Sequence, residues 1–230
     1  DPVSLGVSAA TPAPAFATSG TFLKSLAVGN AGNAVVATGF ATTNNTPLYY
    51  YNTRNPEFTQ PASTVDLNNA TAAASADRSK IWLVQGDPTV TSPPSVYQYA
   101  ASTQLIGATS ITLNQNTILP AIDREATRFV LNGTNVYDSD FGLLGTLPAT
   151  TGAVVLRPDA TRAYTFDSTS GQVHAFDLTA TPNGGAFPEV GSGTALAGSP
   201  GSDVRMAISA DGGSLFLAGS NQIVVQPTPP

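Results

Sequence analysis

The chain has 230 residues, of which 10% are charged, and its nine Lys and Arg against fifteen Asp and Glu give a formal net charge of −6. Nine scattered cations cannot form the basic patch that displaces counterions from phosphates, so nucleic-acid binding is excluded. The chain has no cysteine, which excludes disulfide frameworks, and its single His cannot form a His-based catalytic triad or a metal site with several His ligands. No apolar run reaches the ~18 residues that a membrane span needs. The sequence therefore predicts no metal site, no cofactor and no membrane-spanning segment.

The composition favours an exported, all-β protein. Gly and Pro number 21 and 18, and Lys occurs only at Lys24 and Lys80. Helix formers such as Glu, Lys and Met are scarce and turn residues recur, so long amphipathic helices are not expected. Low Lys and zero Cys in a chain rich in Thr, Ser and Gly are typical of bacterial secreted proteins, and the chain begins at Asp1 without Met, as a processed segment does. We therefore expect a secreted, periplasmic or cell-surface location.

Five copies of one pattern follow one another along the chain. Each copy has a short apolar strand, a turn with Asp or Asn, a dense apolar strand, and two further strands. The turn residues are spaced by 47, 46, 36 and 52 residues, close to the ~40–50 residues of a four-stranded propeller blade. The sequence thus predicts an all-β, five-bladed β-propeller of four-stranded antiparallel blades. The five turn residues are Asn30, Asp77, Asp123, Asp159 and Asp211.

The second strand of a copy is a continuous apolar run rather than an alternating one, as in Ile81–Val84, Phe129–Leu131 and Leu215–Ala218. Such runs are typical of strands covered on both faces, so these strands should be the most buried. Third strands are expected at Leu48–Tyr51, Val96–Tyr99, Asn135–Asp138, Gln172–Asp177 and Gln222–Gln226, and fourth strands at Leu105–Gly107 and Leu143–Gly145.

Two copies carry a recognisable motif. The stretch Arg157–Tyr164, followed by Ser170–Val173 and Phe176–Leu178, and the stretch Ser209–Gly213 resemble the YVTN/YncE-like β-propeller repeat family. The resemblance implies a β-propeller that is secreted or displayed at the cell surface. It bears on the fold far more than on an activity.

The two chain ends are expected to complete one blade. The fifth copy stops after its third strand, and Pro227 cannot continue a central strand. Val3–Val7 precedes the first copy and is similar to the fourth strands, so it should pair beside Gln222–Gln226 and close the ring. This predicts a single domain over residues 1–226 and a Pro-rich tail or linker over residues 227–230. The alternative is that the chain is part of a larger propeller, with an open edge at both ends.

The turn aspartates invite a metal or acid–base interpretation. Each lies in a tight turn, where a carboxylate accepts backbone N–H groups, and the turns of successive blades should lie tens of ångströms apart. We therefore interpret these aspartates as structural.

His174 is interpreted as packing between blades. Asp138-Ser139-Asp140 is interpreted as a hairpin turn, because the Gly and the later ligands of a calcium loop are missing.

One group of polar residues lies at the opposite end of the first strands. Lys24 and Arg205 both stand six residues before their turn residue, in blades that closure makes neighbours. Cations are unusual in innermost strands, so the pair points either to an ion pair with Asp203 or to contact with an anion or sugar. The long loops Ala41–Pro47 and Gly86–Ser95 should project from the same end, as insertions at a binding face do. The candidate ligand-binding residues are Lys24, Asn69, Asn116, Asp203 and Arg205.

Two functions fit these features. The first is a non-catalytic module that binds a protein or a neutral glycan, since the acidic chain repels polyanions. The second is a hydrolase of glycosidase or lactonase type, which needs acids that converge on the channel of the propeller. Only Asp66, Asp167 and Asp203 approach that region, and a lactonase-like set reduces to Asn69, Asn116 and Asp203. The sequence favours the binding module and predicts no catalytic residue.

Overall fold

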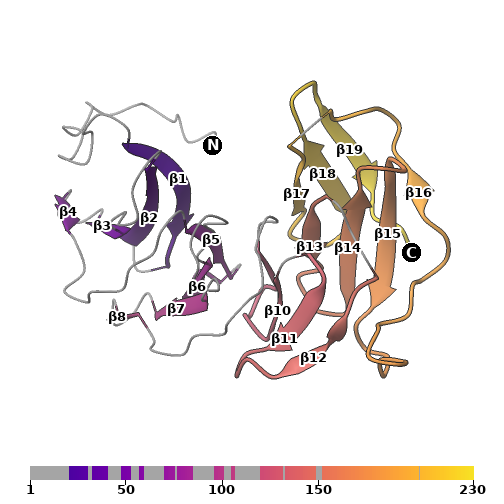
Figure 1. Ribbon diagram of the computed structural model, residues 1–230, viewed down its shortest axis with the longest axis horizontal. Helices are drawn as coiled ribbons and strands as arrows, with labels where there is room; N and C mark the ends of the chain where they lie inside the picture. The colour runs from indigo at the N-terminus through magenta and orange to yellow at the C-terminus, as the bar shows by residue number, and fades with distance from the viewer. Residues whose placement is uncertain are drawn as a thin grey trace.

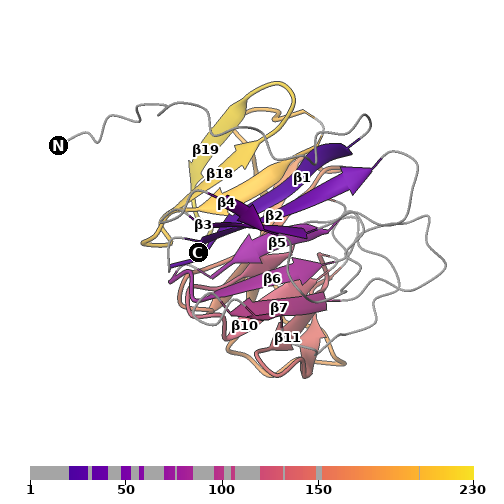
Figure 2. The same ribbon diagram turned by 90° about the vertical axis from the view of Figure 1, so that its left-hand side faces the viewer.

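The computed structural model describes residues 21–30, 33–40, 48–52, 57–59, 70–75, 77–84, 96–100, 105–106, 120–131, 133–148, 152–201 and 203–230. Within these ranges the chain forms nineteen strands and no helix (Figures 1 and 2). The prediction of an all-β chain is therefore confirmed. Accordingly, these ranges contain no helix with the length and apolar character needed to cross a membrane.

The strands form five antiparallel sheets, in each of which the strands follow chain order. The first sheet contains β1 (Thr21–Val28), β2 (Asn33–Phe40), β3 (Leu48–Asn52) and β4 (Glu57–Thr59). The second contains β5 (Thr71–Ala74), β6 (Lys80–Val84), β7 (Val96–Ala100) and β8 (Leu105–Ile106). The third contains β9 (Ala121–Ile122), β10 (Arg128–Leu131), β11 (Asn135–Asp138) and β12 (Leu143–Thr146). The fourth contains β13 (Val154–Leu156), β14 (Arg162–Asp167), β15 (Gln172–Asp177) and β16 (Thr194–Ala195), and the fifth contains β17 (Arg205–Ile208), β18 (Ser214–Ala218) and β19 (Ile223–Pro227).

The repeat pattern placed these strands correctly, because every third strand lies within one residue of its expected bounds. The end of the last strand differs from the prediction. Pro227 pairs with Ser214, and the Thr228 N–H donates to the carbonyl oxygen of Gly213 at 3.1 Å, so the expected tail over residues 227–230 begins inside the sheet. Proline is tolerated at the end of a strand, where its missing N–H interrupts no further ladder bonds.

The first strands of the five sheets lie side by side in an arc (Figure 1). β1 contacts β5, β9 contacts both β5 and β13, and β13 contacts β17. β17 makes no contact of comparable extent with β1 within the described residues. The predicted strand Val3–Val7 and its pairing with the last strand lie outside the described residues, so closure of the ring stays a prediction.

One apolar cluster fills each boundary between successive sheets. Val35 and Tyr50 of the first sheet pack with Ile81 and Leu83 of the second. The boundary between the second and third sheets is aromatic, and it contains Trp82, Phe129, Tyr137 and Phe141. The next two boundaries are filled mainly by aliphatic side chains with Phe176 at one and Tyr164 at the other. Burial between sheets is therefore the main apolar contribution to the stability of this fold.

The second strands show one departure from the predicted burial. Ile81–Val84 and Phe129–Leu131 are fully buried, as expected from continuous apolar runs. Leu215–Ala218 alternates instead, because Leu215 and Leu217 are buried whereas Phe216 is 38% exposed. The reason is that β18 belongs to the fifth sheet, of which only one side is covered by another described sheet. An apolar run cannot reveal whether a second sheet is present to cover it.

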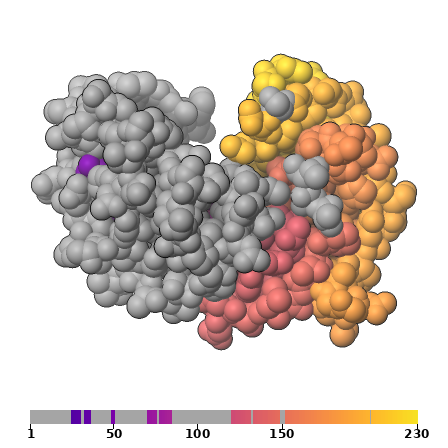
Figure 3. Space-filling model, viewed as in Figure 1, coloured from indigo at the N-terminus to yellow at the C-terminus, as the bar shows by residue number. Residues whose placement is uncertain are grey.

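A long connection after β15 ties the fourth sheet to the third. We call residues 178–193 the strap. It turns tightly between Asn183 and Ala186, and the Gly185 carbonyl accepts the Thr146 N–H at 2.7 Å, while the Phe187 N–H donates to the Thr146 carbonyl at 2.9 Å. The Phe187 ring is buried in the cluster between the two sheets. The strap therefore covers the outer edge of β12 (Figures 1 and 3).

Candidate functional site

The predicted strand-start site is described only in part. Arg205 is the first residue of β17, and both Arg205 and Asp203 are exposed. The backbone of Asp203 lies in the left-handed region with φ 52°, which turns the chain sharply before the strand. Asp203 and Arg205 form no ion pair within the described residues. Asn69 and Asn116 lie outside the described residues, as do Asp66 and the long loops Ala41–Pro47 and Gly86–Ser95, so the role of this site stays a prediction.

Lys24 and Arg205 do not occupy equivalent positions. Ala27 of β1 pairs with Val35, the third residue of β2, and Ala207 of β17 pairs with Phe216, the third residue of β18. Arg205 is therefore equivalent to Ser25, and Lys24 falls in a bulge between the paired residues Leu23 and Ser25. Counting back from the turn residue missed this shift, because the turn of the first sheet is one residue shorter than that of the fifth. A one-residue shift moves a side chain to the other face of a sheet.

The turns between first and second strands form the opposite end of the molecule, and four of them share one hydrogen-bond pattern. In each, a residue with positive φ donates its N–H to a carbonyl three residues earlier. Such tight turns leave several N–H groups without a backbone acceptor, so a nearby side-chain oxygen is needed. The four N–H to O pairs are Arg78 to Ser75, Ala126 to Asp123, Ala160 to Arg157 and Gly212 to Ser209.

The turn aspartates supply that oxygen. The carboxylates of Asp77, Asp159 and Asp211 accept the backbone N–H two residues later, at 3.0, 3.0 and 2.9 Å. Hydrogen bonds from the Ser75 and Ser209 hydroxyls and from these N–H groups lower the pKa of Asp77 and Asp211. Burial acts to raise the pKa of Asp159, but the Thr161 hydrogen bonds and the charge of Arg157 outweigh it and lower that pKa as well. The structural interpretation of these aspartates is confirmed.

The lowered pKa values predict a loss of stability in acid. A carboxyl whose pKa is lower in the folded chain stabilises the fold fully above its unfolded pKa, and this contribution disappears as the pH falls through the folded pKa. We expect the melting temperature to stay level down to about pH 5 and to fall below about pH 4, because Asp77, Asp159 and Asp211 all shift downwards from 3.8. A thermal melt at each pH measures this. The double variant Asp77→Asn with Asp211→Asn should show a shallower fall, and an equally steep fall in both proteins would contradict the assignment.

The third turn departs from the predicted pattern. Glu125, not Asp123, stands three residues before its second strand, as Asp77, Asp159 and Asp211 do. Asp123 is buried and accepts the Arg128 N–H at 2.7 Å and the Thr127 hydroxyl at 2.8 Å. It thus takes the place that the Ser75 and Ser209 hydroxyls hold in other turns. The choice of Asp123 as the repeat residue was wrong by two positions, since two acids stood close together in the sequence.

Successive turns lie closer together than predicted. The Asn30 N–H donates to the Arg78 carbonyl at 2.8 Å, the Asp77 N–H to the Arg124 carbonyl at 3.2 Å, and the Arg124 N–H to the Pro158 carbonyl at 3.2 Å. Backbone groups of four neighbouring turns are therefore directly bonded, and the expectation that the turns lie tens of ångströms apart is wrong. Because the first strands run side by side, their ends meet around one axis.

A polar hollow of about 390 Å³ lies among the third, fourth and fifth turns. Arg157 pairs loosely with Asp159, with Nε 3.5 Å from Oδ2, and its stem lies so close to Gly212 that a Cβ there would come within 3.0 Å of Nε. Arg124 is exposed and makes no side-chain hydrogen bond or ion pair within the described chain. The hollow is lined by Arg124, Glu125, Arg157, Pro158, Asp159, Ala210 and Asp211.

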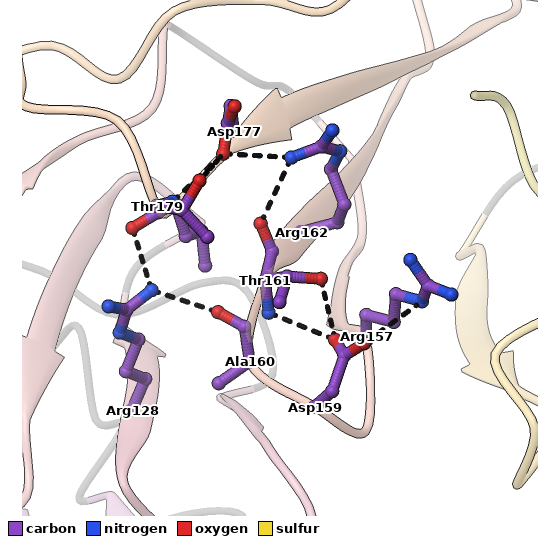
Figure 4. A network of polar contacts seen from close by, with 9 residues as sticks. Arg128, Arg157, Asp159, Ala160, Thr161, Arg162, Asp177 and Thr179 are labelled. Atoms are coloured by element: carbon purple, nitrogen blue, oxygen red, sulfur yellow. Dashed lines mark hydrogen bonds and ion pairs between the residues drawn. The ribbon is translucent and has the colours of Figure 1, made fainter.

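Two further arginines hold the turn end together (Figure 4). Arg128 of β10 reaches across to the fourth sheet, where its Nη1 donates to the carbonyl oxygens of Ala160 at 2.9 Å and Leu178 at 2.7 Å. Arg162 of β14 pairs with Asp177 of β15 at 2.8 Å. The sequence did not indicate these partners, because Arg128 lies 32 residues from Ala160 and 50 from Leu178.

His174 and the Asp138 turn have structural partners. His174 lies on β15 and Glu189 lies in the strap, and His174 Nδ1 is 2.7 Å from Glu189 Oε1. This contact links the strap to β15. Asp138 Oδ1 accepts the N–H groups of Asp140 at 2.9 Å and Gly142 at 2.7 Å, as expected of a hairpin turn. Asp167 likewise accepts the Thr169 N–H at 2.8 Å in its own hairpin. No cluster of three or more potential metal ligands occurs among the residues that the structure describes.

Comparisons with known proteins identify the fold alone. No protein-family profile and no curated protein matches the chain. The solved Dos1 propeller superposes with a TM-score of 0.64 at 14% identity, covering 84% of this chain and 50% of that one. A protein from Lactobacillus plantarum superposes with a TM-score of 0.59 at 14% identity, covering 90% of this chain and 67% of that one. A protein of unknown function from Bacteroides thetaiotaomicron gives 0.55 at 10% identity, covering 90% and 57%.

These superpositions, together with the five sheets, show that the chain has a β-propeller fold. The chain spans between half and two thirds of the length of the three structures. Because unrelated functions share this fold, the likeness carries no activity with it.

Proposed function

We propose that this β-propeller is a non-catalytic binding module, secreted or displayed at a bacterial cell surface, that takes a protein segment or a neutral glycan. The observation that carries the proposal is the state of the turn carboxylates. Asp77, Asp159 and Asp211 each accept hydrogen bonds from their own turn, and these bonds contribute to a pKa below the ordinary value for all three. A general acid in a hydrolase must hold a proton near neutral pH, which requires a raised pKa. Preformed polar groups that are already ionised suit recognition instead.

The strand-start end is the proposed binding face. Arg205 and Asp203 are exposed there without pairing to each other, which leaves a donor and an acceptor for a ligand. Lys24, Asn69 and Asn116 complete the proposed set. The hollow at the turn end is a second polar surface, with Arg124 exposed in it. The net charge of −6 disfavours polyanions at either end.

Retention of the purified chain on an array of neutral glycans tests the binding face. We expect Arg205→Ala to abolish retention and to change the unfolding free energy by less than about 0.5 kcal/mol, because the side chain is exposed. Arg124→Ala, at the opposite end, is the matched control and should bind normally. Loss of retention in Arg124→Ala alone would assign binding to the turn-end hollow. Turnover of a glycoside or lactone that is lost on Asp203→Asn would establish the hydrolase instead.

We also propose that the propeller has five blades and is of the YVTN/YncE-like kind, with residues 3–7 as the outer strand of the fifth blade. Two observations support this. The fifth sheet has three strands among the described residues where the other four have four, and β19 is its outermost strand. The Arg157–Tyr164 stretch that carries the resemblance forms the first hairpin of the fourth sheet.

Deletion of residues 1–8 tests the outer strand. Removing it would expose the edge of β19, so we expect the melting temperature to fall by roughly 2–4 °C, the shift that about 1 kcal/mol produces in a chain of this size. Differential scanning calorimetry measures the shift. Deletion of the C-terminal Pro230, which is exposed, is the control. An unchanged melting temperature would place the outer strand elsewhere.

A further inference from the structure

The polar hollow at the turn end contains two arginines that depart from the repeat. The second to fifth turns align residue by residue through one backbone hydrogen bond, in which an N–H donates to the carbonyl oxygen five residues later. The four N–H to O pairs are Ser75 to Lys80, Asp123 to Arg128, Arg157 to Arg162 and Ser209 to Ser214. Arg157 therefore occupies the position that Ser75, Asp123 and Ser209 hold in the other turns.

Arg157 replaces a residue that caps its turn. In the other three turns, a side-chain oxygen at this position accepts the N–H of the first residue of the second strand. The N–H to O pairs are Lys80 to Ser75 at 3.2 Å, Arg128 to Asp123 at 2.7 Å and Ser214 to Ser209 at 2.9 Å. A guanidinium has only donors, so Arg157 cannot accept the Arg162 N–H. The fourth turn thus lacks a local hydrogen bond and carries a cation instead, and departures of this kind are expected at functional sites.

Arg124 is the second departure. It lies one position further along the third turn, where the fourth and fifth turns have Pro158 and Ala210. Its backbone is held on both sides, because its N–H donates to the Pro158 carbonyl and its carbonyl accepts the Asp77 N–H, both at 3.2 Å. Its side chain is exposed and has no hydrogen bond or ion pair among the described residues. The start of the side chain is therefore fixed, and its guanidinium is available to a ligand.

Both guanidinium groups line the hollow from adjoining turns. Arg157 is half-buried, its stem packs against Gly212 of the fifth turn, and its pair with Asp159 is loose, with Nε 3.5 Å from Oδ2 (Figure 4). Two cations that face one hollow repel each other, and an anion between them removes this repulsion. A carboxylate suits this place, because it accepts two parallel N–H bonds from a planar guanidinium.

The acids of the hollow restrict which carboxylates fit. Glu125, Asp159 and Asp211 face the same space, so the two arginines and three acids give the lining a formal charge of −1. This charge disfavours a polyanion, whereas a molecule with an ammonium group near its carboxylate adds no net charge. Glu125 is exposed, and its carboxylate has no hydrogen bond or ion pair within the described ranges, so it offers an acceptor for the ammonium. The volume of about 390 Å³ lies near the lower end of the roughly 300–1,000 Å³ of small-molecule pockets, which suits a compact ligand.

We propose that the turn-end hollow binds a compact zwitterion of the amino-acid class. The ligand carboxylate lies between Arg124 and Arg157, and its ammonium group faces Glu125. This site is at the opposite end of the molecule from the face proposed above for a protein segment or a neutral glycan. It takes a different ligand and does not depend on that face.

Titration of the isotope-labelled chain, followed by nuclear magnetic resonance, tests the site with simple probes. Glycine, 4-aminobutanoate and 6-aminohexanoate differ only in the separation between ammonium and carboxylate, and acetate and methylammonium each carry one of the two charges. We expect at least one of the three zwitterions to bind at least tenfold more tightly than acetate or methylammonium, and to shift the Nε–H signals of Arg124 and Arg157. Equal binding of acetate would remove the ammonium group from the proposal and overturn it. Unchanged arginine signals would show that the hollow is not the site.

Substitutions separate binding from stability. Arg124→Gln should weaken the best probe at least tenfold, whereas Arg78→Gln is the matched control, because Arg78 is an exposed arginine of the second turn that does not line the hollow. Arg157→Ser restores the oxygen that other turns have, so it should abolish binding while raising the melting temperature by roughly 2 °C. Equal weakening in Arg78→Gln would trace the effect to net charge and overturn the site. A lower melting temperature in Arg157→Ser would show that Arg157 stabilises its turn, and would likewise overturn its role in binding.

Discussion

Replacing Phe129 with alanine is expected to lower the free energy of unfolding by about 3–5 kcal/mol. Phe129 is 1% exposed and lies at the centre of the aromatic boundary between the second and third sheets. Its ring stacks on Trp82 with centroids 4.4 Å apart and on Tyr137 at 5.4 Å, and it meets Phe141 edge-on at 5.3 Å. Alanine removes all three ring contacts and leaves a cavity that the surrounding strands cannot fill.

Urea unfolding followed by fluorescence measures this effect, since Trp82 is the single tryptophan of the chain and stands in the affected boundary. Leu143→Ala is the matched control, because Leu143 is a large apolar residue that is 60% exposed. We expect a change of less than about 0.5 kcal/mol there. A loss of under about 1 kcal/mol in Phe129→Ala would mean that this boundary does not hold the two sheets together.

Replacing Arg128 with methionine is expected to lower the free energy of unfolding by about 2–3 kcal/mol, since hydrogen bonds from a charged donor contribute roughly 1.5–3 kcal/mol. Its guanidinium joins the third sheet to two carbonyl groups of the fourth, those of Ala160 and Leu178. Methionine keeps much of the side-chain volume but leaves both carbonyl oxygens without this donor. The loss should appear as a lower urea midpoint with an unchanged slope.

Arg124→Met provides the control for Arg128. Arg124 lies in the same turn region and carries the same charge, but it is exposed and its side chain has no bonded partner among the described residues. Its replacement should change stability by less than about 0.5 kcal/mol. Equal losses in the two variants would trace the effect to net charge rather than to the carbonyl contacts of Arg128.

The strands could be predicted from the sequence because their signals are local. Apolar runs such as Phe129–Leu131, turn residues at the strand ends and the repeat of about 45 residues placed the strands almost to the residue. The role of Asp77, Asp159 and Asp211 was predicted for the same reason, since each carboxylate bonds an N–H only two residues away. Local geometry suffices for interactions that the chain makes with its immediate neighbours.

Small irregularities of register were beyond the sequence. The bulge at Lys24 and the shorter turn after β1 shifted Lys24 out of line with Arg205. In the third turn, Asp123 and Glu125 lie two residues apart, so the sequence allowed either of them to be the repeat residue. Only the start of β10 and its pairing with β9 showed that Glu125 stands in the repeat position. A shift of one residue changes a sequence pattern only slightly, but it moves the side chain to the other face of the sheet.

Contacts between sheets were decided by the tertiary structure alone. The hollow brings together residues from three turns, Arg128 bonds groups 32 and 50 residues away, and the exposure of Phe216 depends on which sheet stands beside it. Each of these depends on how one sheet is rotated against the next, which follows from the packing of whole boundaries rather than from any short stretch. The sequence by itself thus determined the strands, the turns and their acceptors. The packing of sheet on sheet decided which surfaces meet. The hydrophobic effect is non-directional, so burial of an apolar side chain does not by itself specify which surface covers it.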